Sequence, residues 1–127
     1  MGKYGIVAVN AARLLAGEGS SSPRSAWEQA AKAVFPNSPS SQCKGCPRNA
    51  FLALCEMGLL ARVVTGSYTR SEKNKSYVCR ALMALRLDHT LATDKQALWK
   101  RAVLGEPKKH NSQMDVLLAL WRNRLIE

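Results

Sequence analysis

The sequence predicts an all-α protein, folded as a single compact domain of about six helices that spans residues 1–127. Three observations lead to this fold class. Apolar residues recur every three to four positions through most of the chain, which is the spacing of one face of an α-helix. Proline, glycine and serine separate these segments, and such residues begin and end helices. The chain has 127 residues, 46% of them hydrophobic, which suits one domain with one core.

Two helices are predicted in the first third of the chain. The first covers Lys3–Ala16, on the spacing of its apolar side chains, and ends at Gly17 and Gly19. The second begins after Ser22, which is a favoured cap residue and is followed by a proline, the residue favoured at the first helical position. An apolar stripe runs along this second helix, and Pro36 ends it.

A long loop rich in proline, serine and cysteine is predicted between the second and third helices, over about ten residues from Pro36. We expect Pro47 to open the third helix. Apolar residues repeat at helical spacing after it, and Gly58 fits the left-handed residue that ends many helices. Residues 62–68 are β-branched and interrupted by glycine, which favours an extended loop over a helix.

Pairs of polar residues predict where the fourth and fifth helices begin. Thr69 and Glu72 have the spacing of a capping box, in which each side chain bonds the other residue's free backbone N–H. The helix that they open is expected to reach Leu87. Thr93 and Gln96 repeat this spacing ahead of the fifth helix.

The fifth helix is expected to end at Gly105, and a basic loop follows it. Asn111 or Ser112 is expected to cap the sixth helix, whose broad apolar face extends to Leu125. The predicted connections on either side of the third helix are about eleven and about a dozen residues long. A helix-turn-helix motif joins its helices by only three or four residues, so we do not predict that motif.

The charge balance is the most unusual feature of the composition. The chain carries 19 Lys and Arg against 9 Asp and Glu, a net charge of +10. A field of this sign attracts phosphate polymers and acidic proteins, so DNA, RNA or an acidic protein is the expected partner. No apolar run approaches the roughly 18 to 20 residues of a membrane span, and Asn10 and Arg13 interrupt the N-terminal apolar stretch. We therefore expect a cytoplasmic protein that does not bind a membrane.

One face of the predicted fourth helix is basic. At 100° per residue, its cations fall within a sector of about 80°, opposite the apolar sector that would pack on the core. Tyrosines lie among these cations, and an aromatic ring can stack on a base while cations hold phosphate. The alternative interpretation of this basic face is an ordinary solvated helix surface. The predicted nucleic-acid-binding residues, with neighbouring cations included, are Arg62, Tyr68, Arg70, Lys73, Tyr77, Arg80, Lys108 and Lys109.

The four cysteines are candidates for a metal site or a reactive thiol site. Cys43 and Cys46 have the spacing of one zinc-binding pair, but zinc needs four ligands and the sequence offers no second close pair. Cys46 precedes the proline that opens a helix, and a helix N-terminus stabilises a thiolate. Reduced cysteines are the alternative, with two in the loop and two, Cys55 and Cys79, packed as small hydrophobic residues. A metal bound by Cys43 and Cys46, as zinc or in an iron–sulfur cluster, is thus the cofactor that the sequence leaves open, with zinc the one we name.

The sequence offers no catalytic residues. His89 and His110 lie in separate loops, and no close pair of carboxylates or phosphate-binding glycine motif is present. We therefore expect a non-enzymatic protein that binds nucleic acid or acts in regulation. The alternatives are a protein-interaction module, acting as an adaptor or inhibitor that docks an acidic partner, and a metal- or thiol-dependent redox protein. The sequence makes no prediction of the oligomeric state.

Overall fold

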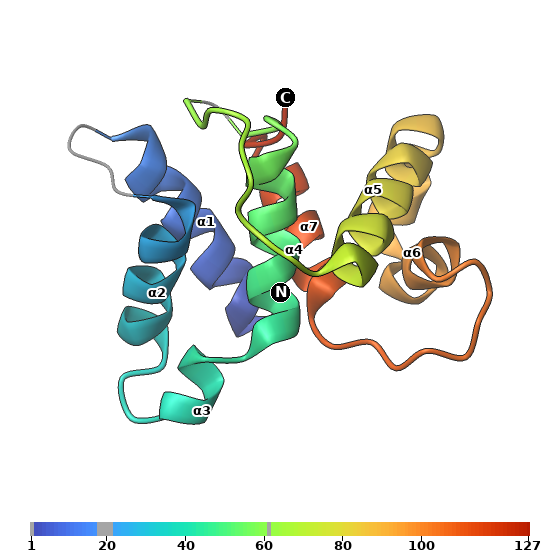
Figure 1. Ribbon diagram of the computed structural model, residues 1–127. Helices are drawn as coiled ribbons and strands as arrows, with labels where there is room; N and C mark the ends of the chain where they lie inside the picture. Colours follow the sequence, from blue (N-terminus) through green and yellow to red (C-terminus); the bar gives the residue numbers. More distant parts are fainter. Residues whose placement is uncertain (1, 18–21, 61) are drawn as a thin grey trace.

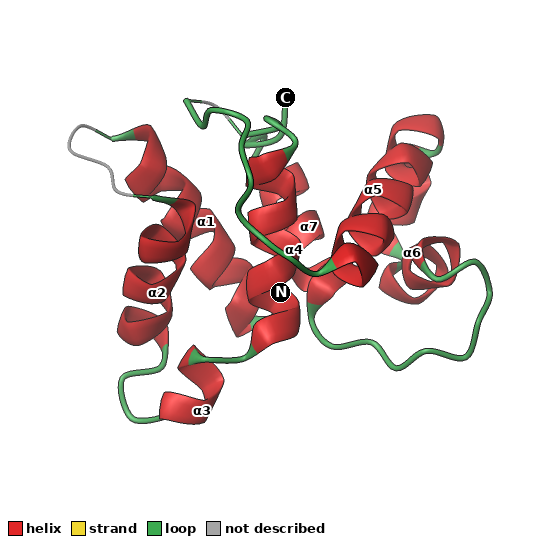
Figure 2. Ribbon diagram, viewed as in Figure 1, coloured by secondary structure: helices red, strands yellow, loops and turns green. Residues whose placement is uncertain are grey.

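Helices make up most of the computed structural model, which describes residues 2–17, 22–60 and 62–127 (Figures 1 and 2). The six predicted helices are all present, and the all-α fold class is confirmed. They are α1 (Lys3–Ala16), α2 (Pro23–Val34), α4 (Gly45–Glu56), α5 (Glu72–Leu87), α6 (Lys95–Ala102) and α7 (Gln113–Arg122). A one-turn helix, α3 (Pro39–Gln42), and a 3-10 helix, η1 (His89–Thr93), complete the described elements.

Helix α4 lies at the centre of the molecule (Figure 1). It contacts α2, α5 and α7, while α1 packs between α2 and α7 and α6 packs on α5. Six consecutive residues of α4, residues 50–55, are buried, so the helix is covered around its whole circumference. The rings of Trp27 on α2 and Phe51 on α4 lie 5.3 Å apart within this core. Burying such large side chains is the main favourable contribution to folding.

The predicted loop after Pro36 was only partly right, because it contains α3. The side chain of Ser38 accepts a hydrogen bond from the backbone N–H of Ser41 and so caps this single turn. Two residues join α3 to α4, a connection as short as that of a helix-turn-helix. The recognition helix of that motif must enter a groove of DNA, so one of its sides must be exposed. Because the middle of α4 is buried on every side, α4 does not serve as a recognition helix.

The predicted boundaries of the first three helices are largely confirmed. Helix α1 has the expected bounds and ends at Gly17, whereas Gly19 lies outside the described residues. The side chain of Ser22 caps α2 by accepting from the N–H of Ser25. Gly58 follows α4 in the left-handed conformation, with φ of +71°. Helix α4 begins two residues before Pro47, because the first-turn N–H groups of a helix have no partner inside it and proline fits any of these positions.

Both predicted capping boxes were wrong. Ser71 caps α5 by accepting from the N–H of Asn74, and Asp94 caps α6 by accepting from the N–H of Ala97. The Thr69 hydroxyl is bonded elsewhere, and Thr93 belongs to η1. The helices therefore begin later than predicted, because a serine or aspartate nearer to the helix satisfied the first-turn N–H groups.

The ends of the last two helices also differ from the prediction. Helix α6 stops at Ala102, three residues before Gly105, which adopts a positive φ of +76° in the loop that follows. Ser112 occupies the cap position of α7 but makes no capping bond with its side chain. Instead, Nε2 of His110 accepts a hydrogen bond of 3.0 Å from the N–H of Met114. Helix α7 ends at Arg122, so Leu125 lies beyond it.

Residues 62–71, here called the strap, connect α4 to α5 and cross the surface of α4 (Figure 1). The expected extended loop is confirmed in this segment. An isolated bridge between Leu60 and Ile126 precedes the strap. None of the helices within the described ranges is long and apolar enough to cross a bilayer.

Candidate nucleic-acid interface

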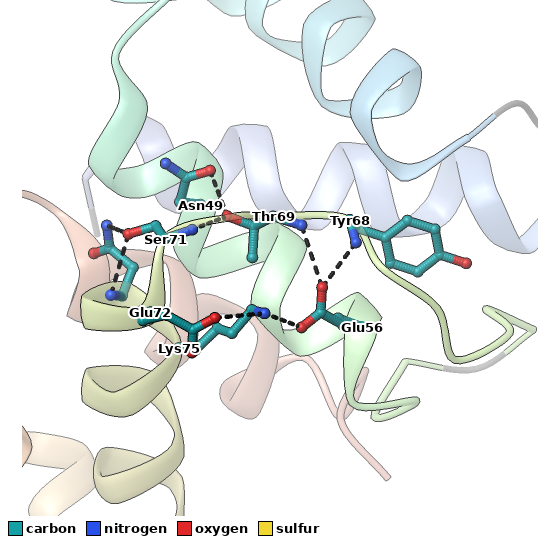
Figure 3. A network of polar contacts seen from close by, with 8 residues as sticks. Asn49, Glu56, Tyr68, Thr69, Ser71, Glu72 and Lys75 are labelled. Carbon is teal, nitrogen blue, oxygen red and sulfur yellow. Dashed lines mark hydrogen bonds and ion pairs between the residues drawn. The ribbon is translucent and has the colours of Figure 1, made fainter.

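Glu56, the last residue of α4, fastens the strap to the core (Figure 3). Its Oε1 accepts hydrogen bonds from the backbone N–H groups of Tyr68 at 2.8 Å and Thr69 at 3.3 Å. Its Oε2 lies 2.6 Å from Nζ of Lys75 on α5. The hydrogen bond from Lys75, followed by that from the Tyr68 N–H, lowers the pKa of the Glu56 carboxyl. One carboxylate thus joins α4, the strap and α5.

A second set of bonds fixes the end of the strap (Figure 3). The Thr69 hydroxyl donates to Oδ1 of Asn49 at 2.8 Å and accepts from the N–H of Ser71 at 3.2 Å. The Ser71 Oγ accepts from both the backbone and the side-chain nitrogen of Asn74. These bonds leave the Asn49 amide nitrogen and the Ser71 hydroxyl hydrogen without an acceptor among the described residues. Both remain able to donate to a ligand.

The strap forms one wall of a hollow with a volume of about 580 Å³. Two arginines reach it, Arg24 from the first turn of α2 and Arg70 from the strap. The described residues that line it include no carboxylate, although Oε1 of Glu28 lies 3.2 Å from Nε of Arg24 at an exposed position. The lining residues are Arg24, Asn49, Ser67, Tyr68, Thr69, Arg70 and Ser71.

A smaller hollow of about 270 Å³ shares Tyr68 with the first, since this residue lines both. Arg62 contributes to this second hollow. Its Nη1 donates to the carbonyl oxygen of Ala16 at 3.0 Å, which places a cation at the C-terminal end of α1. We use the name strap face for Arg24, Asn49, Arg62, Tyr68 and Arg70.

Tyr68, which lines both hollows, is bonded through its backbone and its side chain. Its hydroxyl donates to the carbonyl oxygen of Val64 at 2.6 Å, and its backbone N–H is bonded to Glu56. Gly66 lies against the hydroxyl end of the ring, and a Cβ at that position would come within 3.0 Å of it. Any other residue at position 66 would therefore displace the ring.

Four of the other five predicted residues line a third hollow, between α5 and the loop after α6. This α5–α6 groove has a volume of about 280 Å³ and is lined by Lys73, Tyr77, Arg80 and Lys108, together with Glu72 and Glu106. Two carboxylates therefore lie among its cations. Lys109 is exposed and is not part of its lining.

Tyr77 and Arg80 are half-buried and serve the fold, contrary to the exposure that a binding face requires. Nε of Arg80 donates to the carbonyl oxygen of Ala102 at 2.7 Å. This bond supplies a donor to a carbonyl at the C-terminal end of α6, which has no partner inside the helix. The ring of Tyr77 meets the edge of Trp99 with centroids 5.2 Å apart. Nζ of Lys108 lies 4.0 Å from a carboxylate oxygen of Glu106.

The predicted single basic face is therefore divided into two groups. Arg70 precedes the cap of α5 and lies on the strap, so it does not share a helix face with Lys73, Tyr77 and Arg80. Arg24, the second cation of the large hollow, was not predicted. It comes from a different helix, and no spacing along the sequence relates it to Arg70.

The cysteines occupy four different settings. Cys43 is exposed after α3, and Cys46 lies in the first turn of α4. Cys55 is fully buried in α4, and this burial raises the pKa of its thiol to about 12. Cys79 is exposed on α5, so the prediction that it packs in the core was wrong. Among the described residues, no three cysteine, histidine or acidic side chains gather closely enough to hold a metal ion.

The two histidines both pack against tryptophans. The ring of His110 lies 5.1 Å from Trp99 and caps α7, while that of His89 lies 5.5 Å from Trp121. Burial is the largest influence on His110 and lowers its pKa, because it disfavours the charged ring. Its neutral Nε2 is the acceptor that α7 uses.

These features define a small, basic, all-α protein with an arginine-lined hollow on a strap beside its central helix. The chain belongs to a protein family described as a family of unknown function (DUF6979), whose model matches residues 1–127. No curated protein and no solved structure shows significant similarity to the chain.

Proposed function

We propose that the protein binds nucleic acid through the strap face and does not catalyse a reaction. One observation carries the proposal: the hollow of about 580 Å³ combines two arginines with hydroxyl and amide donors, and no carboxylate is found among its described lining residues. In this proposal Arg24 and Arg70 hold phosphate groups of the backbone.

The donors at this hollow suit a phosphate group. A guanidinium presents paired N–H donors that match two phosphate oxygens, and hydroxyl and amide groups are common phosphate contacts. The free Asn49 amide nitrogen and the free Ser71 hydroxyl hydrogen supply two further donors. Arg62 at the neighbouring hollow provides a third cation for a second phosphate along the strand.

The net charge of +10 supports the same proposal, because a positive field raises the rate at which a polyanion meets the protein. The α5–α6 groove is the weaker candidate. Its cations lie beside Glu72 and Glu106, and these carboxylates would repel phosphate.

The test compares two double variants with the same change in charge. Arg24→Gln with Arg70→Gln removes both cations of the hollow, whereas Arg13→Gln with Arg101→Gln removes two exposed arginines elsewhere. Binding to labelled single-stranded DNA, RNA and duplex DNA is measured by fluorescence anisotropy at several salt concentrations. We expect the first variant to lose at least tenfold in affinity, and its log–log salt slope to flatten by roughly 1.4 to 1.8, since each lost phosphate contact removes about 0.7 to 0.9.

Equal losses in both double variants would show that only diffuse charge attracts the strand, and the proposed site would be wrong. Absence of binding to every nucleic acid at low salt would overturn the function itself. In that case, binding of an acidic polypeptide such as poly-glutamate would identify an acidic protein as the partner.

A further inference from the structure

We infer that the strap face selects single strands, because Tyr68 is positioned to stack on an unpaired base while Arg24 and Arg70 hold its phosphate. This inference rests on the proposed function and specifies its ligand as a nucleotide whose base is not paired. It follows from the presence of one aromatic residue, Tyr68, in the lining of two hollows that both contain arginine.

The ring is rigid before any ligand arrives. Its backbone N–H is bonded to Glu56, its hydroxyl is bonded to the Val64 carbonyl, and Gly66 lies against the hydroxyl end of the ring. A ring that is already fixed loses little conformational entropy when a base stacks on it. Tyr68 and Tyr77, the other predicted aromatic, are both half-buried against the core, but only Tyr77 also has an aromatic partner, Trp99, which occupies part of its ring.

The size of the hollow also favours one nucleotide over a duplex. A volume of about 580 Å³ lies within the range of roughly 300 to 1,000 Å³ that is typical of sites for one small organic molecule. In a duplex the bases are stacked and paired inside the helix, so none could reach Tyr68 without being flipped out, which requires energy. A single strand presents its bases freely.

Cations are present in both hollows that Tyr68 lines. Arg24 and Arg70 line the larger hollow and Arg62 lines the smaller one. One phosphate would meet the arginine pair, the base would stack on Tyr68, and the next phosphate would approach Arg62. Alternation of cations with an aromatic ring is the general arrangement of single-strand binding surfaces.

The experiment is a double-mutant cycle between the protein and the ligand. Wild type and Tyr68→Leu are titrated with an oligonucleotide, with the same strand carrying abasic sites, and with the matching duplex. Tyr68→Phe is the matched control, because it keeps the ring and removes only the hydroxyl bond to Val64. Circular dichroism and thermal melting establish that each variant folds.

We expect Tyr68→Leu to weaken single-strand binding by roughly 5- to 150-fold, which corresponds to the loss of one stacked base. Tyr68→Phe should stay near the wild-type affinity, and duplex binding should change little in either variant. The abasic strand should bind wild type as weakly as the intact strand binds Tyr68→Leu, and combining the two changes should cause no further loss. That lack of additivity would identify stacking as the lost contact.

Three results would overturn the inference. If Tyr68→Leu binds single strands as wild type does while Arg24→Gln with Arg70→Gln binds weakly, phosphate binding stands and stacking fails. If wild type binds duplex as tightly as a single strand, the claimed selectivity fails. If a nucleoside monophosphate displaces the strand at equal concentration, the hollow binds free nucleotides and not a strand.

Discussion

The strap face and the α5–α6 groove contain the same kinds of residue, arginine or lysine beside a tyrosine, but differ in the acidic residues that line them. In the groove, Arg80 satisfies the end of α6 and Lys108 lies beside Glu106. On the strap face, Arg24 and Arg70 line a hollow whose described lining includes no carboxylate. Cations have partners in both regions, since Arg24 pairs with Glu28 and Arg62 donates to a helix-end carbonyl as Arg80 does. The difference lies in the lining of the hollows, where carboxylates stand among the cations of the groove and none stands among the described lining residues around Arg24 and Arg70.

The largest expected effect comes from releasing the strap. Glu56→Ala should lower the free energy of unfolding by about 1–3 kcal/mol, because the N–H groups of Tyr68 and Thr69 lose their acceptor. It should also weaken single-strand binding, since Tyr68 is no longer held. Urea denaturation and anisotropy measure the two effects.

Glu56→Gln is the matched control for that variant, because its amide oxygen still accepts from the strap. Its loss of stability should be smaller than that of Glu56→Ala. If both variants keep the stability and the affinity of wild type, the strap is held by something other than this carboxylate.

Arg80→Gln separates the two regions most directly. It removes the hydrogen bond to Ala102, so we expect unfolding to require about 0.5–1.5 kcal/mol less. Nucleic-acid affinity should fall no further than in the surface control Arg101→Gln. Thermal melting and anisotropy are measured for Arg80→Gln and Arg101→Gln. If Arg80→Gln keeps the stability of wild type but loses nucleic-acid affinity, the binding site lies in the α5–α6 groove.

Acid should loosen the start of α7, where His110 accepts the capping hydrogen bond, before it affects the strap face. The pKa of His110 is lower in the folded protein than its usual value of about 6.5. The unfolded chain therefore binds more protons in the window just below that value, and stability falls as the pH decreases through it. The charged ring can no longer accept the bond from Met114 at the start of α7.

The pH effect is the smallest that we predict and is measured as melting temperature between pH 8 and pH 5. The indole N–H of Trp99, which donates to the carbonyl of Lys108, is a local NMR probe of the same loop. His110→Gln keeps an acceptor that does not titrate, so its melting temperature should fall less over this range. If the variant and wild type have parallel pH profiles, His110 is not the group that titrates.

Local chemistry made much of the fold predictable. Ser22 with the following proline, and Gly58 with its left-handed backbone, act within a few residues of chain, and both predictions were confirmed. The helix starts at Thr69 and Thr93 were wrong because a second cap residue stood closer to each helix. Where several serines, threonines or aspartates compete, spacing alone does not identify the cap.

The candidate site was less predictable than the fold. Arg70 was predicted from helical periodicity and Arg62 and Tyr68 as its neighbours, but Arg24 lies 46 residues before Arg70 and shares a hollow with it only through the folding of the chain. The fold also places Arg70 in a different hollow from Lys73, Tyr77 and Arg80, with which helical periodicity had grouped it. Tyr77 faces Trp99, a contact between α5 and α6 that no local pattern encodes.

The position of α7 has a consequence for how the chain acquires its structure during synthesis. This helix lies against α1 and α4 and buries most of its side chains there. Because a ribosome releases the N-terminal residues first, α1 must wait for residues 113–122 before one of its apolar sides is covered. Until then that side is open to solvent and to chaperones. The nascent chain should therefore resist proteolysis only after α7 has emerged from the exit tunnel, and stalled chains that end before Gln113 should remain sensitive.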